Sequence, residues 1–254
     1  MVIYMDYITA ISLLIILALV PWSLYFIYYS KLKTKHIEMF IVGAVGWLVA
    51  LLLRLPILTL VNQTGNLWLI IFISPLLAGV FEESVRFLLI RKTIEPESLV
   101  GVVLSFGIGW GIGEILVLHT LSLVNLMIII AFNISVPGMP PLPSPDQLFY
   151  LGLLGCYERW IAVAAHVAFT LIIIRAVPRR YIYLLAAVFG HFLLDFGVVI
   201  VLYLVKNVVL VEVAATILTA GLYLFLVYLR LPLRDIFTRP TDVPLTSEEM
   251  SPDF

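Results

Sequence analysis

The sequence has few charged residues and one cysteine. Only 12% of its 254 residues are Asp, Glu, Lys or Arg, whereas 63% are hydrophobic. Soluble domains average about 25% charged residues, so the composition predicts an integral membrane protein. The lone Cys156 excludes an intramolecular disulfide and a cysteine zinc cluster. Because the net charge is −1, the chain lacks the basic surplus that nucleic-acid binding needs, and nucleic acid is excluded as a partner.

Long apolar runs dominate the chain. A transmembrane helix needs about 20 apolar residues, and seven runs meet this length. The predicted fold class is therefore all-α, a polytopic membrane protein with seven transmembrane helices in the cell membrane. The predicted spans are residues 7–29, 37–61, 67–90, 99–130, 149–174, 181–205 and 208–229.

Basic residues fall in alternate connections, which is the positive-inside pattern. Lysines fill the first loop, and arginines occur after the third, fifth and seventh spans. We therefore expect the N-terminus outside and the C-terminus in the cytoplasm. Residues 1–231 form one predicted transmembrane domain, with a catalytic core at about 67–205, and 232–254 form a polar, disordered cytoplasmic tail.

Two stretches have unusual local composition. The fourth loop contains VPGMPPLPSPDQ, whose prolines predict a rigid, extended connector. The fourth span begins LSFGIGWGIGE, with glycine at every second position from Gly107 to Gly113. Such dense glycine lets another helix approach closely, and alternation by two is not one helical face. This stretch is therefore predicted to be either locally unwound or packed on two sides.

Ionisable side chains inside predicted spans are costly and usually face a bundle interior or a wet cavity. At 1.5 Å per residue, Glu82, His166 and His191 each lie about 13–15 Å from the cytoplasmic end of their helix. Polar side chains from three spans therefore lie at one depth in the membrane. The candidate site residues are Glu82, Glu83, Arg86, Glu114, Glu158, Arg159, His166, His191 and Asp195.

Helical spacing predicts how these residues pair. His191 and Asp195 are four apart and share a helix face. Glu82 and Arg86 are also four apart, so Arg86 is predicted to pair with Glu82 and to leave Glu83 free. Arg159 is predicted to pair with a carboxylate of another span. Arg54, near the outer end of the second span, is predicted to be structural, snorkelling outward or pairing with the acids of the fifth span.

Two hydrolytic chemistries are compatible with this set. His166 and His191 with Asp195 can bind Zn²⁺, while a second carboxylate takes a proton from water. Without metal, a glutamate–histidine pair can activate water while another histidine stabilises an oxyanion. The catalytic group predicted for either route is Glu82, Glu83, Arg86, Glu114 and Glu158.

The segments GVFEESVRF, GIGWGIGE, YERWIAVAAH and GHFLLD occur in this order between Gly79 and Asp195. Together they resemble the YhfC family of intramembrane metalloproteases, within the wider group of PrsW and the CAAX prenyl proteases. The resemblance implies that these motifs form the active site of a protease. Trp110 stands where the family's glycine-rich motif tends to have histidine.

We expect an intramembrane peptidase that cleaves a membrane-embedded or membrane-associated polypeptide, with Zn²⁺ as the candidate cofactor. The residues leave two alternatives open. One is a membrane scaffold or receptor whose polar network is structural. The other is a proton-coupled transporter, because chains of Glu, His and Asp also relay protons.

Overall fold

A computed structural model of the chain describes residues 5–94, 100–177 and 180–229. Within these ranges the regular elements are helices, and seven of them are long and apolar enough to cross a membrane. The predicted multi-pass, all-helical membrane protein is therefore confirmed. The helices are α1 Tyr7–Ser30, α2 Thr34–Gln63, α3 Leu67–Thr93, α4 Val100–Glu114, η1 Ile115–Thr120, α5 Leu121–Ala131, α6 Pro145–Ile174, α7 Ile182–Val205 and α8 Val208–Tyr228.

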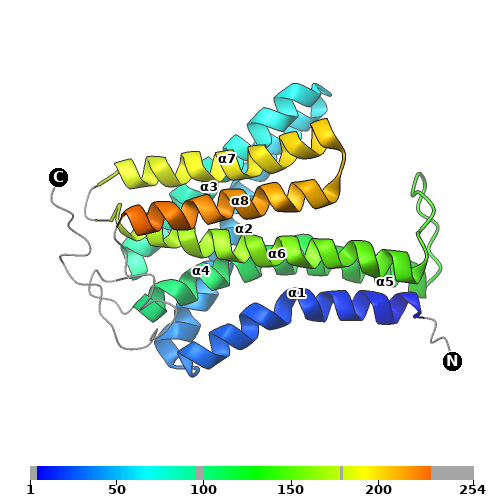
Figure 1. The fold of residues 1–254 in the computed structure, drawn as a ribbon, viewed down its shortest axis with the longest axis horizontal. Helices are drawn as coiled ribbons and strands as arrows, with labels where there is room; N and C mark the ends of the chain where they lie inside the picture. The colour runs from blue at the N-terminus through cyan, green and yellow to red at the C-terminus, as the bar shows by residue number, and fades with distance from the viewer. Residues whose placement is uncertain (1–4, 95–99, 178–179, 230–254) are drawn as a thin grey trace.

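Helix α4 lies at the centre of one half of the bundle. Each residue from Val100 to Gly113 is buried, which is unusual for a helix that also contributes to a membrane span. Helix α2 packs on α4 and α3, α3 packs on α7, and α6 packs on α4, α1 and α8. In Figure 1, α6, α7 and α8 run side by side, whereas α2 passes behind them obliquely.

The alternating glycines of α4 are two interleaved pairs that face two neighbouring helices. A Cβ atom added to Gly109 would lie 2.0 Å from the carbonyl oxygen of Phe40, and Gly113 meets Ala44 in the same way, so this pair faces α2. Cβ atoms added to the other pair, Gly107 and Gly111, would meet Val163 and its neighbours, so this pair faces α6. Packing on two sides is confirmed, and the glycine stretch is regular α-helix rather than unwound.

The fourth predicted span is not one uniform helix. After Glu114 the chain continues as the π-helix η1 over Ile115–Thr120 before α5 begins. A π-helix accommodates an extra residue in the turn and redirects the helix axis, and such turns are frequent at functional sites. The central helix therefore changes direction directly beside one of the predicted site carboxylates.

The proline-rich fourth loop ends earlier than predicted. Helix α6 begins at Pro145 rather than at residue 149, and Ser144 caps it in a reciprocal capping box with Gln147. The last part of SPDQ is therefore a helix start, with proline in the first turn, where its missing N–H costs nothing. The predicted tail at 232–254 lies outside the described residues.

Candidate functional site

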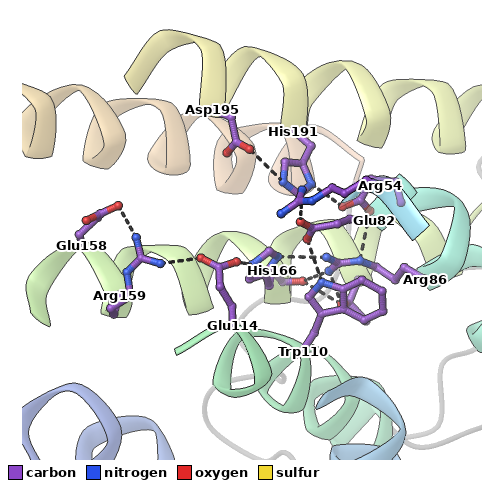
Figure 2. Close-up of polar contacts among 12 residues, drawn as sticks. Arg54, Glu82, Arg86, Trp110, Glu114, Glu158, Arg159, His166, His191 and Asp195 are labelled. Carbon is purple, nitrogen blue, oxygen red and sulfur yellow. Dashed lines mark hydrogen bonds and ion pairs between the residues drawn. The ribbon is translucent and has the colours of Figure 1, made fainter. Parts of the chain in front are cut away.

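Polar side chains from five helices meet inside the bundle (Figure 2). They come from the same spans that the sequence singled out, with the addition of α2. Buried charges in an apolar span need partners, and in this network nearly every charged atom faces an opposite charge or a hydrogen-bond donor. The network comprises Arg54, Glu82, Glu83, Arg86, Trp110, Glu114, Glu158, Arg159, His166, Thr170, His191 and Asp195.

Glu82 is held by residues of α2 and α4. Arg54 Nη1 donates to one carboxylate oxygen of Glu82 at 2.8 Å, and Trp110 Nε1 donates to the other at 3.1 Å. The predicted pairing of Arg86 with Glu82 is wrong. Helical spacing allowed that pair, but Arg54 reaches Glu82 from the neighbouring helix and leaves Arg86 to Glu83. Arg54 is thus part of this network rather than a snorkelling side chain.

Glu83 and Arg86 form a fully buried ion pair, with Arg86 Nε 3.2 Å from Glu83 Oε2. Arg86 Nη1 also donates to the backbone carbonyl of His166 at 2.6 Å and to Thr170 Oγ1 at 2.9 Å. Its guanidinium group lies over the ring of Trp110, 4.4 Å from the centroid. Arg86 therefore links α3 to α6 and α4. The prediction that Glu83 is unpaired is wrong, because this buried carboxylate pairs with Arg86.

Glu114 joins α4 to α6. One of its oxygens lies 2.7 Å from Nη1 of Arg159, and the other lies 2.8 Å from Nε2 of His166. Arg159 also bonds Glu158, the preceding residue. The prediction that Arg159 pairs with a carboxylate of a neighbouring span is confirmed, and the partner is the glutamate that ends the glycine-rich motif.

The contacts of His166 define its tautomer. Arg86 Nη2 lies 3.0 Å from His166 Nδ1, and a guanidinium group can only donate, so Nδ1 accepts. The ring proton is then on Nε2, where it is donated to Glu114. His166 is thus oriented by two charged neighbours from different helices.

His191 is oriented by carboxylates on both sides. Its Nδ1 lies 2.7 Å from Glu83 Oε1, and its Nε2 lies 3.6 Å from Asp195 Oδ2 on the same helix face. The ring stacks on Phe169 with an interplanar angle of 5° and is 5.8 Å from the ring of His166. The predicted proximity of His191 and Asp195 is confirmed.

A cavity of about 340 Å³ opens onto this network. Glu83 and Arg86 are not among its lining residues, so they support the site from behind, whereas Glu82 borders the cavity directly. The remaining lining is apolar and comes from α2, α3, η1, α6, α7 and α8. The polar lining residues are Arg54, Ser74, Glu82, Glu114, Glu158, Arg159, His166, His191, Asp195 and Thr219.

Three of these residues stand close enough to hold one metal ion. Glu82, Glu114 and His166 each offer a ligand atom, and the three atoms lie within 4.8 Å of one another. His191 and Asp195, which the sequence placed in the metal set, are not part of this group. The described residues therefore bring together two carboxylates and one imidazole, from α3, α4 and α6.

The sequence was also compared with known proteins. Residues 15–218 match the family described as YhfC intramembrane metalloprotease. This chain belongs to the YhfC family. It is 29% identical over 240 residues to the "Uncharacterized membrane protein YhfC" of Bacillus subtilis (strain 168), a match that covers 83% of this chain and 89% of that protein. No solved structure matches the chain.

The metal that the family description implies fits the donor atoms of this YhfC-family chain. Zn²⁺ accepts imidazole nitrogen and carboxylate oxygen, and three protein ligands leave a fourth position open. Each carboxylate of the group has further lone pairs besides those used by Arg54, Trp110 and Arg159. His166 needs one change, because Nε2 must be unprotonated to bind a cation: the ring proton moves to Nδ1, and Arg86 Nη2, which can only donate, must turn away from that nitrogen.

The network also has a charge surplus that a divalent ion would balance. It contains five carboxylates and three guanidinium groups, so the carboxylates exceed the guanidinium groups by two. Uncompensated negative charge is expensive within a membrane span. A divalent cation would remove the surplus, as would protonation of the two histidines of the network.

Two residues of the network were not predicted from the sequence. Trp110 was noted only as a departure from the family motif, and Thr170 was not singled out. Tryptophan and threonine are common in membrane helices, so composition does not mark these two residues as part of a site. Trp110 could have been found from its place in GIGWGIGE, one turn before Glu114.

Proposed function

We propose that this chain is a metal-dependent intramembrane peptidase, with Glu82, Glu114 and His166 as the metal ligands. The single observation that supports it most is the convergence of these three donors from three membrane-spanning segments on the lining of one cavity. Zn²⁺ is the preferred candidate because Mg²⁺ and Ca²⁺ favour all-oxygen sites. When bound, the ion supplies a Lewis acid for the scissile carbonyl and an acidified water molecule.

His191 is proposed as the proton carrier. The residue lines the cavity, its Nδ1 is held by Glu83, and the carboxylate of Asp195, 3.6 Å from Nε2, stabilises its protonated form. Water adds its oxygen to the carbonyl carbon and gives a proton to Nε2. His191 then passes that proton to the peptide nitrogen as the carbon–nitrogen bond breaks, and an acid and an amine are released.

The arginines are proposed to hold the carboxylates rather than to react. Arg54 and Arg159 each donate to one oxygen of Glu82 and Glu114, respectively, which fixes the orientation of the two carboxylates. Arg86 holds the backbone of His166 through its hydrogen bond to the carbonyl oxygen. Preorganised groups of this kind lower the cost of reaching the transition state because they need not rearrange during the reaction.

Elemental analysis of detergent-purified protein tests the metal directly. We expect about one zinc per chain in the wild type, and loss of zinc in Glu114→Gln and in His166→Gln. His119→Gln is the matched control, because His119 contacts Cys156 and lies outside the group of three donors. Wild-type protein purified without chelator that contains no divalent metal would refute the metal-dependent proposal.

Peptide hydrolysis tests the reaction. Wild-type protein in liposomes should cleave members of a library of single-span peptides, and Glu82→Gln should not. A zinc-containing wild type that cleaves no member of the library would instead favour the structural scaffold. Uptake of a solute driven by a pH gradient would favour the transporter.

A further inference from the structure

The packing of α2 against α4 closes one route between the cavity and the exterior. Over its first half, α2 touches α4 backbone to backbone. A Cβ on Gly43 would lie 2.1 Å from the carbonyl oxygen of Phe106, and Gly113 is similarly close to Ala44. No polypeptide can pass between these helices where they are in such contact.

The two helices separate after Glu114. Helix α4 becomes the π-helix η1 there, and within the described residues α2 has no extended contact with η1 or α5. Figure 1 shows α3, which follows α2, beginning above α7, whereas α5 lies near α1 on the opposite side of α6. The second half of α2 and η1 therefore lack the close contact that α2 makes with α4.

The cavity reaches the surface between these two segments. Leu58 of α2 and Leu118 of η1 both line the cavity, together with Arg54 and Glu114 deeper inside. Leu118 is 45% exposed, whereas the other lining residues are half-buried or buried. A side chain that both lines the cavity and faces outward marks the place where the cavity opens.

The opening faces lipid rather than water. Leu118 lies 18 residues from the start of α4 and 13 from the end of α5, near the middle of the span. Exposed leucines also occur on the helices of both sides, Leu55 and Leu60 on α2 and Leu121 on α5. In the membrane these side chains contact acyl chains, so whatever passes them must itself be embedded in the bilayer.

We infer that a membrane-embedded polypeptide segment reaches the site laterally, between α2 and η1, past Leu58 and Leu118. This inference rests on the proposed function for the chemistry but not for the route. Because the cavity volume is about 340 Å³ and a helix is about 10–12 Å across, the segment enters it as an extended stretch of a few residues. The matching substrate class is a transmembrane segment with a helix-breaking stretch.

Site-specific photo-cross-linking tests the route without requiring activity. Benzoylphenylalanine is placed at Leu58 or Leu118 in the His191→Gln background, which keeps the probe intact. The probe is a biotinylated leucine-rich peptide of about 20 residues with a central Gly-Pro break, reconstituted in the same liposomes. Controls carry the photo-reactive residue at Leu24 of α1 or Leu224 of α8, which are 59% and 71% exposed.

We expect several-fold more cross-linking at Leu58 and Leu118 than at the controls, and we expect excess unlabelled peptide to suppress it there alone. Equal yields at the four positions, or yields that excess peptide does not suppress, would overturn the inference. Saturable cross-linking without hydrolysis by the wild type would leave the route standing and refute the peptidase.

Closing the opening gives a second test. Leu58→Trp with Leu118→Trp should lower cleavage of the embedded peptide several-fold while the zinc content stays that of the wild type. Leu24→Trp with Leu224→Trp is the control and should cleave normally. Full cleavage by the variant with the filled opening would overturn the route while leaving the peptidase intact.

Discussion

The indole nitrogen of Trp110 lies 3.1 Å from Oε2 of Glu82, and the same ring covers the guanidinium group of Arg86. One fully buried side chain of α4 thus contacts a proposed metal ligand and the residue that holds the backbone of a second ligand, His166. Trp110 occupies the motif position where the family resemblance expects histidine. It supplies a hydrogen-bond donor there, as a histidine could.

Trp110→Phe should weaken zinc binding by about tenfold, because loss of a partner that orients a ligand typically costs 10–100-fold in metal affinity. The phenyl ring keeps most of the packing and removes the donor to Glu82. Titration with a competing chelator measures the effect. Trp47→Phe is a matched control, since Trp47 is equally buried and its indole nitrogen has no hydrogen-bond partner among the described residues. Equal zinc affinity in the two variants would contradict the positioning role.

Arg54 and Glu82 should be energetically coupled. Removing one partner of a buried ion pair leaves an uncompensated charge and costs about 3 kcal/mol of folding free energy. We expect Arg54→Gln and Glu82→Gln each to lower the melting temperature in detergent, and the double variant to lower it by less than the sum. Strict additivity would mean that the 2.8 Å contact contributes nothing. Arg54→Lys, which keeps the charge, should retain part of the stability.

Substitutions of His166 and of His191 should differ in their effect on zinc content. His191→Gln should keep zinc and lose hydrolysis, whereas His166→Gln should lose both, because only His166 belongs to the group of three close donors. Metal content and peptide cleavage measured on the same samples provide the comparison. Loss of zinc in His191→Gln would restore the set of ligands that the sequence alone suggested.

Glu83→Gln should preserve zinc and slow cleavage through His191. Its oxygen lies 2.7 Å from His191 Nδ1, so the amide alters how strongly the ring holds a proton. The expected readout is a displaced limb in the profile of cleavage rate against pH, together with a reduced rate. A uniform loss of rate with an unchanged profile would indicate a structural role only. Glu83→Asp should recover part of the rate.

Gly109→Ala should strongly destabilise the bundle. The added Cβ would lie 2.0 Å from the carbonyl oxygen of Phe40, so α2 and α4 must move apart. Gly221→Ala in α8 is the control, because nothing lies within 4 Å of its Cβ position and alanine favours a helix by about 1 kcal/mol. The melting temperature should fall in the first variant and stay or rise in the second.

The sequence by itself determined the membrane class, the number of spans and most of the charged residues that meet inside the bundle, but not Arg54, Trp110 or Thr170. Apolar runs of membrane length have few other stable forms, and an ionisable group in such a run must face inward. Spacing along one helix also predicted the proximity of His191 and Asp195, since residues four apart share a face.

Only the tertiary structure decided which charges pair and which donors meet. Helical spacing favoured Arg86 with Glu82, but Arg54 arrives from α2 and takes that carboxylate, so Arg86 pairs with Glu83. The group of Glu82, Glu114 and His166 likewise depends on the rotation and separation of three helices. Those quantities are set by close contacts such as the glycine pairs of α4, which no pattern within a single span specifies.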